Sequence, residues 1–289
     1  MEIWAILQPI VKLLLYILSF LLVGTSLFIF HFRTLLSRST NVYCCMLVRR
    51  SSLYGSIIAP LLLLMTAGNI GGDLRSAIDP LMINIALTSK VGQSVLVLFS
   101  GFLIAFLWIS FFQKQRFTLG GVGCALILLS FSLYGHSTIN GLSSQLLIIF
   151  HLGSISFWVG SFLPLRYSTF GKFEEENLFQ IAHQFGVYAV YYIAVLLISG
   201  IILGTILVGG IEQLLTSDYG KAFLFKLAFA TILLGIGAVN KFLLVPQLKN
   251  KNSYHVIKLR KSISLEICIL FIILVISSLL TTSIELPLK

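Results

Sequence analysis

Long apolar stretches separated by short polar connections recur along the whole 289-residue chain. Several reach or exceed the roughly 18–20 residues that an α-helix needs to cross the hydrocarbon core of a bilayer. They lack the alternation of apolar and polar residues over about ten positions that marks the strands of a membrane β-barrel. The pattern predicts an all-α, polytopic membrane protein, one domain over residues 1–289, with eight spans in a single bundle. The spans lie at about residues 8–30, 51–69, 91–112, 119–135, 146–165, 184–208, 222–246 and 262–283.

Composition agrees with a membrane protein, since 57% of the residues are hydrophobic, 10% are charged and the mean hydropathy is +1.00. A soluble domain of this length would carry far more charge. The formal net charge of +10 does not indicate a nucleic-acid partner, because basic residues of membrane proteins gather in cytoplasmic loops. The sequence has neither a CxxC pair nor a P-loop motif, so we expect no thiolate metal motif and no direct drive by ATP.

The distribution of lysine and arginine predicts how the spans are oriented, because the side richer in these residues is cytoplasmic. Thirteen basic residues lie in the connections after the first, third, fifth and seventh spans, and four lie on the opposite side. We therefore expect both termini on the outer face. The larger group comprises Arg33, Arg38, Arg49, Arg50, Lys114, Arg116, Arg166, Lys172, Lys249, Lys251, Lys258, Arg260 and Lys261, and the smaller one Arg75, Lys90, Lys221 and Lys289.

Two histidines bracket the polar connection between the fourth and fifth spans. His136 closes the fourth span and His151 lies about five residues into the fifth, both on the predicted outer side. A histidine in a membrane segment is costly without a partner, and imidazole is a common ligand of copper, zinc, iron and nickel. The two histidines are therefore the best candidates for metal ligands, and the ten-residue connection between the spans would let their rings converge. The alternative is that both only form hydrogen bonds with loop carbonyl groups.

Two imidazoles are an incomplete coordination shell, so further groups would have to complete or shape the site. Trp158 follows His151 by seven residues, which places both on one helix face, where Trp158 is either a packing aromatic or a lid. Lys226, near the outer end of the seventh span, either snorkels to the interface or acts as a counter-charge. The outer-side candidates are Asp73, Asp79, Tyr134, Trp158 and Lys226.

Three polar residues lie at similar depth near the inner face of the last two spans. They are Asn240, Lys241 and Glu266. Because a buried carboxylate needs a partner, we expect them to form a clamp between the two helices; a role in inner-side gating is the alternative.

Small residues also recur in the fifth span at spacings of three or four. They are Gly153, Ser156, Gly160 and Pro164. Such a stripe lets the backbone of another membrane helix approach closely. We therefore expect another helix to pack against this face.

From Tyr134 onward, short motifs follow one another at helical spacing. They are Gly135-His136, His151 with Trp158-x-Gly160, Ser199-Gly200, Tyr219-Gly220-Lys221 with Lys226, Asn240-Lys241 with Pro246, and Glu266. In this order they resemble the copper resistance D family of bacterial inner-membrane proteins, over about the last 150 residues. Residues 134–283 are therefore interpreted as the region similar to the family, whereas residues 1–133 share with it only several hydrophobic spans.

The resemblance implies an eight-helix protein of the bacterial cytoplasmic membrane that moves copper, with uptake from the periplasm as the expected direction. Copper would be held by His136 and His151, both termini would be periplasmic, and the partners to consider are a periplasmic copper-binding protein and the lipid bilayer. We expect a transporter and not an enzyme. Two other functions stay open: a membrane b-type haem protein that transfers electrons through paired histidines, and a membrane assembly protein whose histidines bind nothing.

Overall fold

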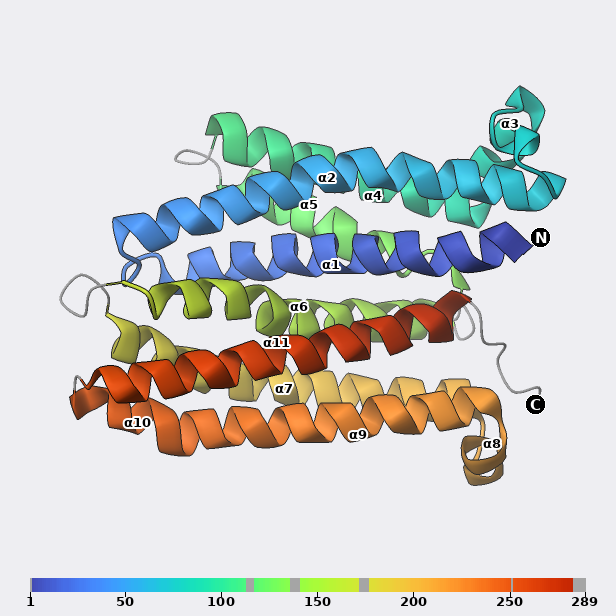
Figure 1. Cartoon of the computed structure of the whole chain (residues 1–289). Helices are drawn as coiled ribbons and strands as arrows, with labels where there is room; N and C mark the ends of the chain where they lie inside the picture. The colour runs from blue at the N-terminus through green and yellow to red at the C-terminus, as the bar shows by residue number, and fades with distance from the viewer. Residues whose placement is uncertain (1, 113–116, 136–140, 172–176, 251, 283–289) are drawn as a thin grey trace.

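The computed structural model describes residues 2–112, 117–135, 141–171, 177–250 and 252–282. Within these residues the chain is helical, and the long helices run antiparallel in one bundle (Figure 1). The prediction of an all-α protein is confirmed. The elements are α1 (Glu2–Phe32), α2 (Arg38–Gly71), η1 (Arg75–Ala77), α3 (Pro80–Thr88), α4 (Lys90–Leu107), η2 (Trp108–Phe112), α5 (Phe117–Ser130), α6 (Leu142–Ser168), α7 (Leu178–Val208), α8 (Ile211–Thr216), α9 (Asp218–Val239), η4 (Asn240–Leu244), α10 (Val245–Gln247), η5 (Leu248–Asn250) and α11 (Ser253–Thr282).

Seven segments among the described residues are long and apolar enough to cross a membrane, namely those built on α1, α2, α4, α6, α7, α9 and α11. The fourth predicted span differs, because α5 has only 14 residues and ends at Ser130 instead of continuing to residue 135. Near this end, the hydroxyls of Ser130 and Ser132 donate to the carbonyls of Ile127 and Leu129. Such local bonds compete with continued helix. The seven long helices nevertheless show a polytopic membrane protein.

α2 begins thirteen residues before the predicted start of the second span, at Arg38 and not at residue 51. Ser37 caps it, since its hydroxyl oxygen accepts a hydrogen bond from the Thr40 backbone N–H at 3.2 Å. A serine in this position satisfies one of the free N–H groups of the first turn. The early turns carry Arg38, Arg49 and Arg50, so hydropathy alone placed the helix start too late.

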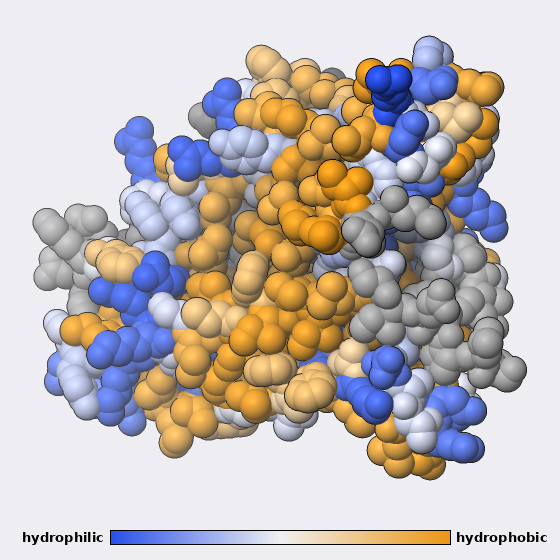
Figure 2. Space-filling view, turned by 45° about the vertical axis from the view of Figure 1, so that its right-hand side comes forward, coloured by the Kyte–Doolittle hydropathy of each residue, from blue (hydrophilic) through white to orange (hydrophobic). Residues whose placement is uncertain are grey.

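The two ends of the bundle differ in the short elements that they carry (Figure 1). One end is called here the α8 end. It contains the start of α1, the finish of α11 and the short helices α3 and α8. At the opposite α10 end, α1 finishes and α11 starts, beside α10. Figure 2 shows hydrophobic residues gathered in a broad middle band, with hydrophilic residues toward both ends. This distribution is the one that a bilayer-spanning bundle requires.

α1 lies at the centre of the bundle, against α2, α6 and α11. The first helices, α2, α4 and α5, pack on one side of it, and α6, α7, α9 and α11 form a second group. The predicted close helix contact of the small-residue stripe in the fifth span is confirmed at Gly160, which faces Gly24 of α1. The Thr25 hydroxyl donates to the Gly160 carbonyl at 3.0 Å across the same contact.

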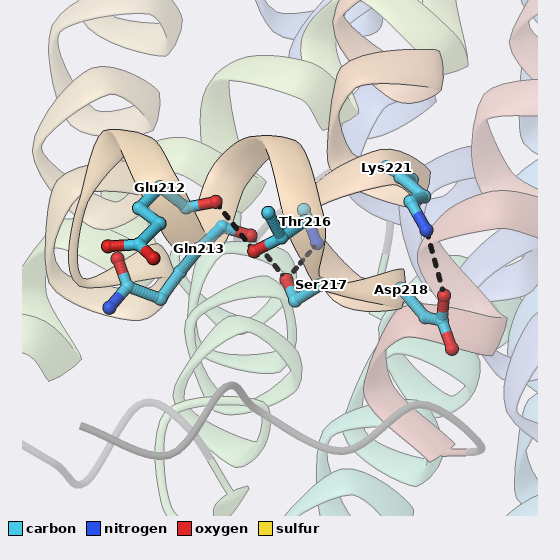
Figure 3. Close-up of polar contacts among 7 residues, drawn as sticks. Glu212, Gln213, Thr216, Ser217, Asp218 and Lys221 are labelled. Carbon is cyan, nitrogen blue, oxygen red and sulfur yellow. Dashed lines mark hydrogen bonds and ion pairs between the residues drawn. The ribbon is translucent and has the colours of Figure 1, made fainter.

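A tight corner joins α8 to α9 at the α8 end (Figure 3). Ser217 caps α9 by accepting a hydrogen bond from the Gly220 backbone N–H at 2.9 Å. A Cβ atom at Gly220 would lie 2.4 Å from the Leu214 carbonyl oxygen, so only glycine lets α8 fold back this closely. Lys221 and Asp218 form an exposed ion pair at 3.5 Å. The corner fixes the start of α9, the helix that carries Lys226.

Candidate functional site

His151 lies ten residues into α6, deeper than the five predicted, and its ring packs against α7. Its Nδ1 atom is 3.2 Å from the Leu196 carbonyl oxygen and 3.3 Å from the Ser199 hydroxyl. A Cβ atom at Gly200 would lie 3.0 Å from the His151 Cε1 atom. Ser199 and Gly200, two residues of the sequence motif, therefore form the surface of α7 against which the imidazole packs, called here the His151 seat.

The hydrogen bond from His151 fixes which ring nitrogen carries the proton. A carbonyl oxygen only accepts, so Nδ1 must donate to Leu196, and Nε2 keeps its lone pair. This is the arrangement that second-shell partners impose on metal-binding histidines. The alternative of a histidine bound to a carbonyl group thus describes Nδ1, whereas Nε2 has no hydrogen-bond partner among the described residues.

Lys226 approaches this histidine from α9. Its ammonium group lies within electrostatic range of the His151 imidazole. The side chain is half-buried. Two of the residues predicted for one site, on two different helices, thus lie within electrostatic range of each other.

His136, the other predicted ligand, lies outside the described residues. Tyr134 is described, and the ammonium group of Lys12 lies 5.1 Å from the centroid of its ring. The same ammonium donates to the Thr281 carbonyl at 3.0 Å. Lys12 therefore ties α1 to the end of α11 and to the segment before His136. The sequence motifs do not include this lysine, although a single charge inside an apolar span is a signal for such a residue.

Asp73 and Asp79 accept backbone hydrogen bonds within the connection between α2 and α3. Asp73 Oδ1 accepts from the Ser76 backbone N–H at 2.7 Å, and Asp79 caps α3 by accepting from the Leu81 N–H at 2.8 Å. The hydrogen bonds from Ser76 hold the pKa of Asp73 below its ordinary value. Both residues are exposed. Among the described residues, no group of three or more histidine, cysteine, aspartate or glutamate side chains is placed to hold a metal ion.

A cavity of about 240 Å3 opens further along α6, between α6, α7, α9 and α11. Trp158 lines it and is 6% exposed. It lies two helical turns, about 10 Å of rise, beyond His151 on the same face. Most of the wall is apolar, from residues such as Phe162, Phe185 and Leu234. Trp158 is therefore a wall of this interior space, on the side toward His151.

The polar groups of the cavity wall are those that the sequence predicted for the clamp, Asn240, Lys241 and Glu266. Asn240 Nδ2 donates to Glu266 Oε2 at 2.8 Å, and the two residues are 8% and 3% exposed. Lys241 lines the cavity too, but its ammonium lies over the Phe242 ring, 5.5 Å from the centroid. The described structure contains no ion pair between Lys241 and Glu266. The partner of the carboxyl group is the amide.

A π-helical turn, η4, places Asn240 and Lys241 on the cavity wall. The Val245 N–H bonds to the Asn240 carbonyl, five residues back. Pro246 follows and has no N–H to bond to Phe242, so the regular ladder is broken there. Wider turns of this kind occur often at functional sites. The Asn240-Lys241…Pro246 motif therefore has a structural reason.

The other described histidines lie toward the α10 end and take no part in this site (Figure 1). His31 Nε2 is 3.0 Å from the Tyr192 hydroxyl, and its ring packs against Tyr188. His183 is exposed. His31 therefore contacts α7 near the α10 end, whereas His151 packs against α7 beside Leu196 and Ser199.

Comparison with known families gives two matches along this chain. Residues 1–145 match the copper resistance protein D-like N-terminal domain, and residues 179–280 match copper resistance protein D. The first match corrects the expectation that residues 1–133 share only hydrophobic spans with the family.

Among curated proteins, the chain is similar to the copper transport protein CutJ of Bacillus subtilis (strain 168), with 27% identity over 239 residues. The match covers 76% of this chain and 44% of CutJ, so the chain spans less than half of that relative's length. No solved structure matches. With both halves matched, the chain belongs to the copper resistance D family.

Proposed function

We propose that this protein moves copper ions across the bacterial cytoplasmic membrane, inward from the periplasm, with copper as its substrate. The observation that carries the proposal is the hydrogen bonding and position of the His151 ring. Its Nδ1 is committed to Leu196, its Nε2 is left for a ligand, and it stands on the face of α6 that leads to the Trp158 cavity. A transport path needs an outer binding group and interior space beyond it, and we assign these two parts to His151 and to the Trp158 cavity.

In this proposal His136 and His151 together bind copper at the periplasmic end, and Lys226 and Tyr134 shape the site. The orientation follows from the basic residues, whose described majority lies toward the α10 end (Figure 1). With α5 as an eighth, short span, both termini are periplasmic. Asp73 and Asp79 have other hydrogen-bonding duties in the α2–α3 connection, so water or a periplasmic copper-binding partner completes the copper shell.

Vesicles of opposite orientation test the direction. Cells that lack other copper carriers and produce this protein are converted to right-side-out and to inverted membrane vesicles, and copper entry is measured in both. We expect copper to enter right-side-out vesicles faster than inverted ones. In right-side-out vesicles, the His151→Ala variant should take up copper no faster than vesicles that lack the protein. Faster entry in inverted vesicles alone would show export instead. Equal entry with and without the protein would contradict transport.

A further inference from the structure

The buried pair Asn240–Glu266 has more hydrogen-bonding capacity than the surrounding protein uses. The amide nitrogen of Asn240 donates to Glu266 Oε2, but Asn240 Oδ1 is buried and has no hydrogen-bond partner among the described residues. Buried acceptors are normally satisfied. Both side chains are more than nine-tenths buried and line the cavity. The pair therefore presents an unused acceptor at a wall that is otherwise mostly apolar.

The charged groups around Glu266 do not neutralise a carboxylate there. The side chain of Lys241, on η4, packs against α7: its Cγ atom would lie 3.3 Å from a Cβ atom built on Gly186. Its ammonium group lies over the Phe242 ring and not at the carboxyl group. From α6, Arg166 bonds to Ser264, and on α11 itself Arg260 bonds to Thr169.

Among the residues that the structure describes, the remaining helices bring no ion pair to this carboxyl group either. The α7 residues that line the cavity are uncharged. On α1, Lys12 bonds to Thr281 and His31 to Tyr192. An ionised carboxyl group in the empty cavity would thus depend on one amide, which is costly in a low-dielectric interior.

We propose that Glu266 is a proton-exchange site, at which each singly charged copper ion that passes the Trp158 cavity takes the place of one proton. With the cavity empty, Glu266 is a neutral acid. Arrival of Cu⁺ releases the proton from the carboxyl oxygen to water, and the carboxylate compensates the charge of the ion. When copper leaves, the carboxylate takes up a proton from the side on which copper was released. One Cu⁺ moves one way and one H⁺ the other, so charge and atoms balance and no electron is transferred.

Asn240 suits this exchange because an amide serves both states of the acid. Its Nδ2 donates to the carboxylate in the arrangement described above. A half-turn of the amide group brings Oδ1 to the carboxyl group, where it accepts from the neutral acid. A lone carboxyl with one amide oxygen is also a poor shell for Na⁺, since hard cations need several oxygen ligands. The pair therefore favours a proton as the exchanged ion.

This inference rests on the proposed copper movement, and flux into proteoliposomes separates the two. Purified full-length protein is reconstituted with an internal pH dye, and Cu⁺ is supplied at equal concentration on both sides. For one-for-one exchange, a lumen more acidic by one pH unit should drive about tenfold copper accumulation. Glu266→Gln should remove this accumulation, whereas Cys268→Ser, at an exposed position two residues away on α11, should keep it.

The outcomes are distinct. Copper flux in the wild type that ignores the pH gradient, or accumulation retained by Glu266→Gln, would overturn proton exchange while transport stands. Accumulation driven by a Na⁺ gradient would overturn the choice of ion. Absence of copper flux would contradict both proposals. In case Glu266→Gln does not fold, infrared difference spectra of the wild type give a second test. Copper binding should remove a carboxylic-acid C=O band, and an unchanged band would overturn the proposal.

Discussion

Gly24 of α1 and Gly160 of α6 touch backbone to backbone: a Cβ atom built on Gly160 would lie 2.5 Å from the Gly24 Cα atom. This contact joins the central helix to the helix that carries His151 and Trp158. Neither glycine has room for a methyl group, so α1 and α6 approach this closely only because both positions lack a side chain. The position of the candidate site depends on it.

Gly160→Ala should therefore lower the free energy of unfolding by about 3 kcal/mol, because the methyl group forces the two backbones apart. The matched control is Gly235→Ala on α9, where a Cβ atom meets nothing within 4 Å; it should change stability by less than about 1 kcal/mol. Thermal or denaturant unfolding in detergent measures both. Equal stability of the two variants would show that α1 and α6 do not approach as described.

Gly200→Ala should disturb the His151 seat without removing a ligand. The added Cβ atom would lie 3.0 Å from Cε1 and 3.3 Å from Nδ1 of the imidazole, so the ring must shift and its hydrogen bond to Leu196 is disturbed. Loss of such second-shell orientation weakens metal binding about tenfold or more. Copper titration of the purified variant beside Gly235→Ala checks this. Unchanged copper affinity in Gly200→Ala would mean that the orientation of His151 is irrelevant to copper.

Removing only Asn240, the amide partner of Glu266, should lower the free energy of unfolding more than replacing both residues with apolar ones. Asn240→Ala leaves a buried carboxyl group without its donor, which should cost about 1–3 kcal/mol. Asn240→Leu combined with Glu266→Leu should recover much of this loss, because apolar side chains need no partner. Lys241→Ala should matter less, since its ammonium lies over Phe242. If Lys241→Ala is the most damaging of these changes to the melting temperature, the lysine and not the amide holds Glu266.

The proposed orientation predicts which positions react with an impermeant thiol reagent. In a variant without the four native cysteines, a cysteine at Asp218, 91% exposed at the α8 end, should be labelled from outside intact spheroplasts. A cysteine at Ser253, exposed at the α10 end, should be labelled only after the membrane is opened. The reverse pattern would place His151 toward the cytoplasm and invert the proposed path.

The sequence predicts the long spans because twenty apolar residues have few alternatives to a membrane helix. It fails at α5, where Ser130 and Ser132 end the helix with bonds to the preceding turn, and at Arg38, where a polar helix start leaves no trace in hydropathy. It predicts the Asn240–Glu266 contact because a buried acid needs a partner. The Leu196 carbonyl that orients His151 could not be predicted, since every residue offers a carbonyl group and only packing selects one.

An equilibrium titration of the purified protein with copper tests directly whether His136 and His151 hold the metal ion. The wild type, the double variant His136→Ala/His151→Ala, and His183→Ala as a control at an exposed histidine toward the α10 end are measured side by side. The account predicts that the double variant loses most of the copper affinity, because two imidazoles are the core of the shell, and that His183→Ala binds like the wild type. Equal copper binding by the wild type and the double variant would contradict it.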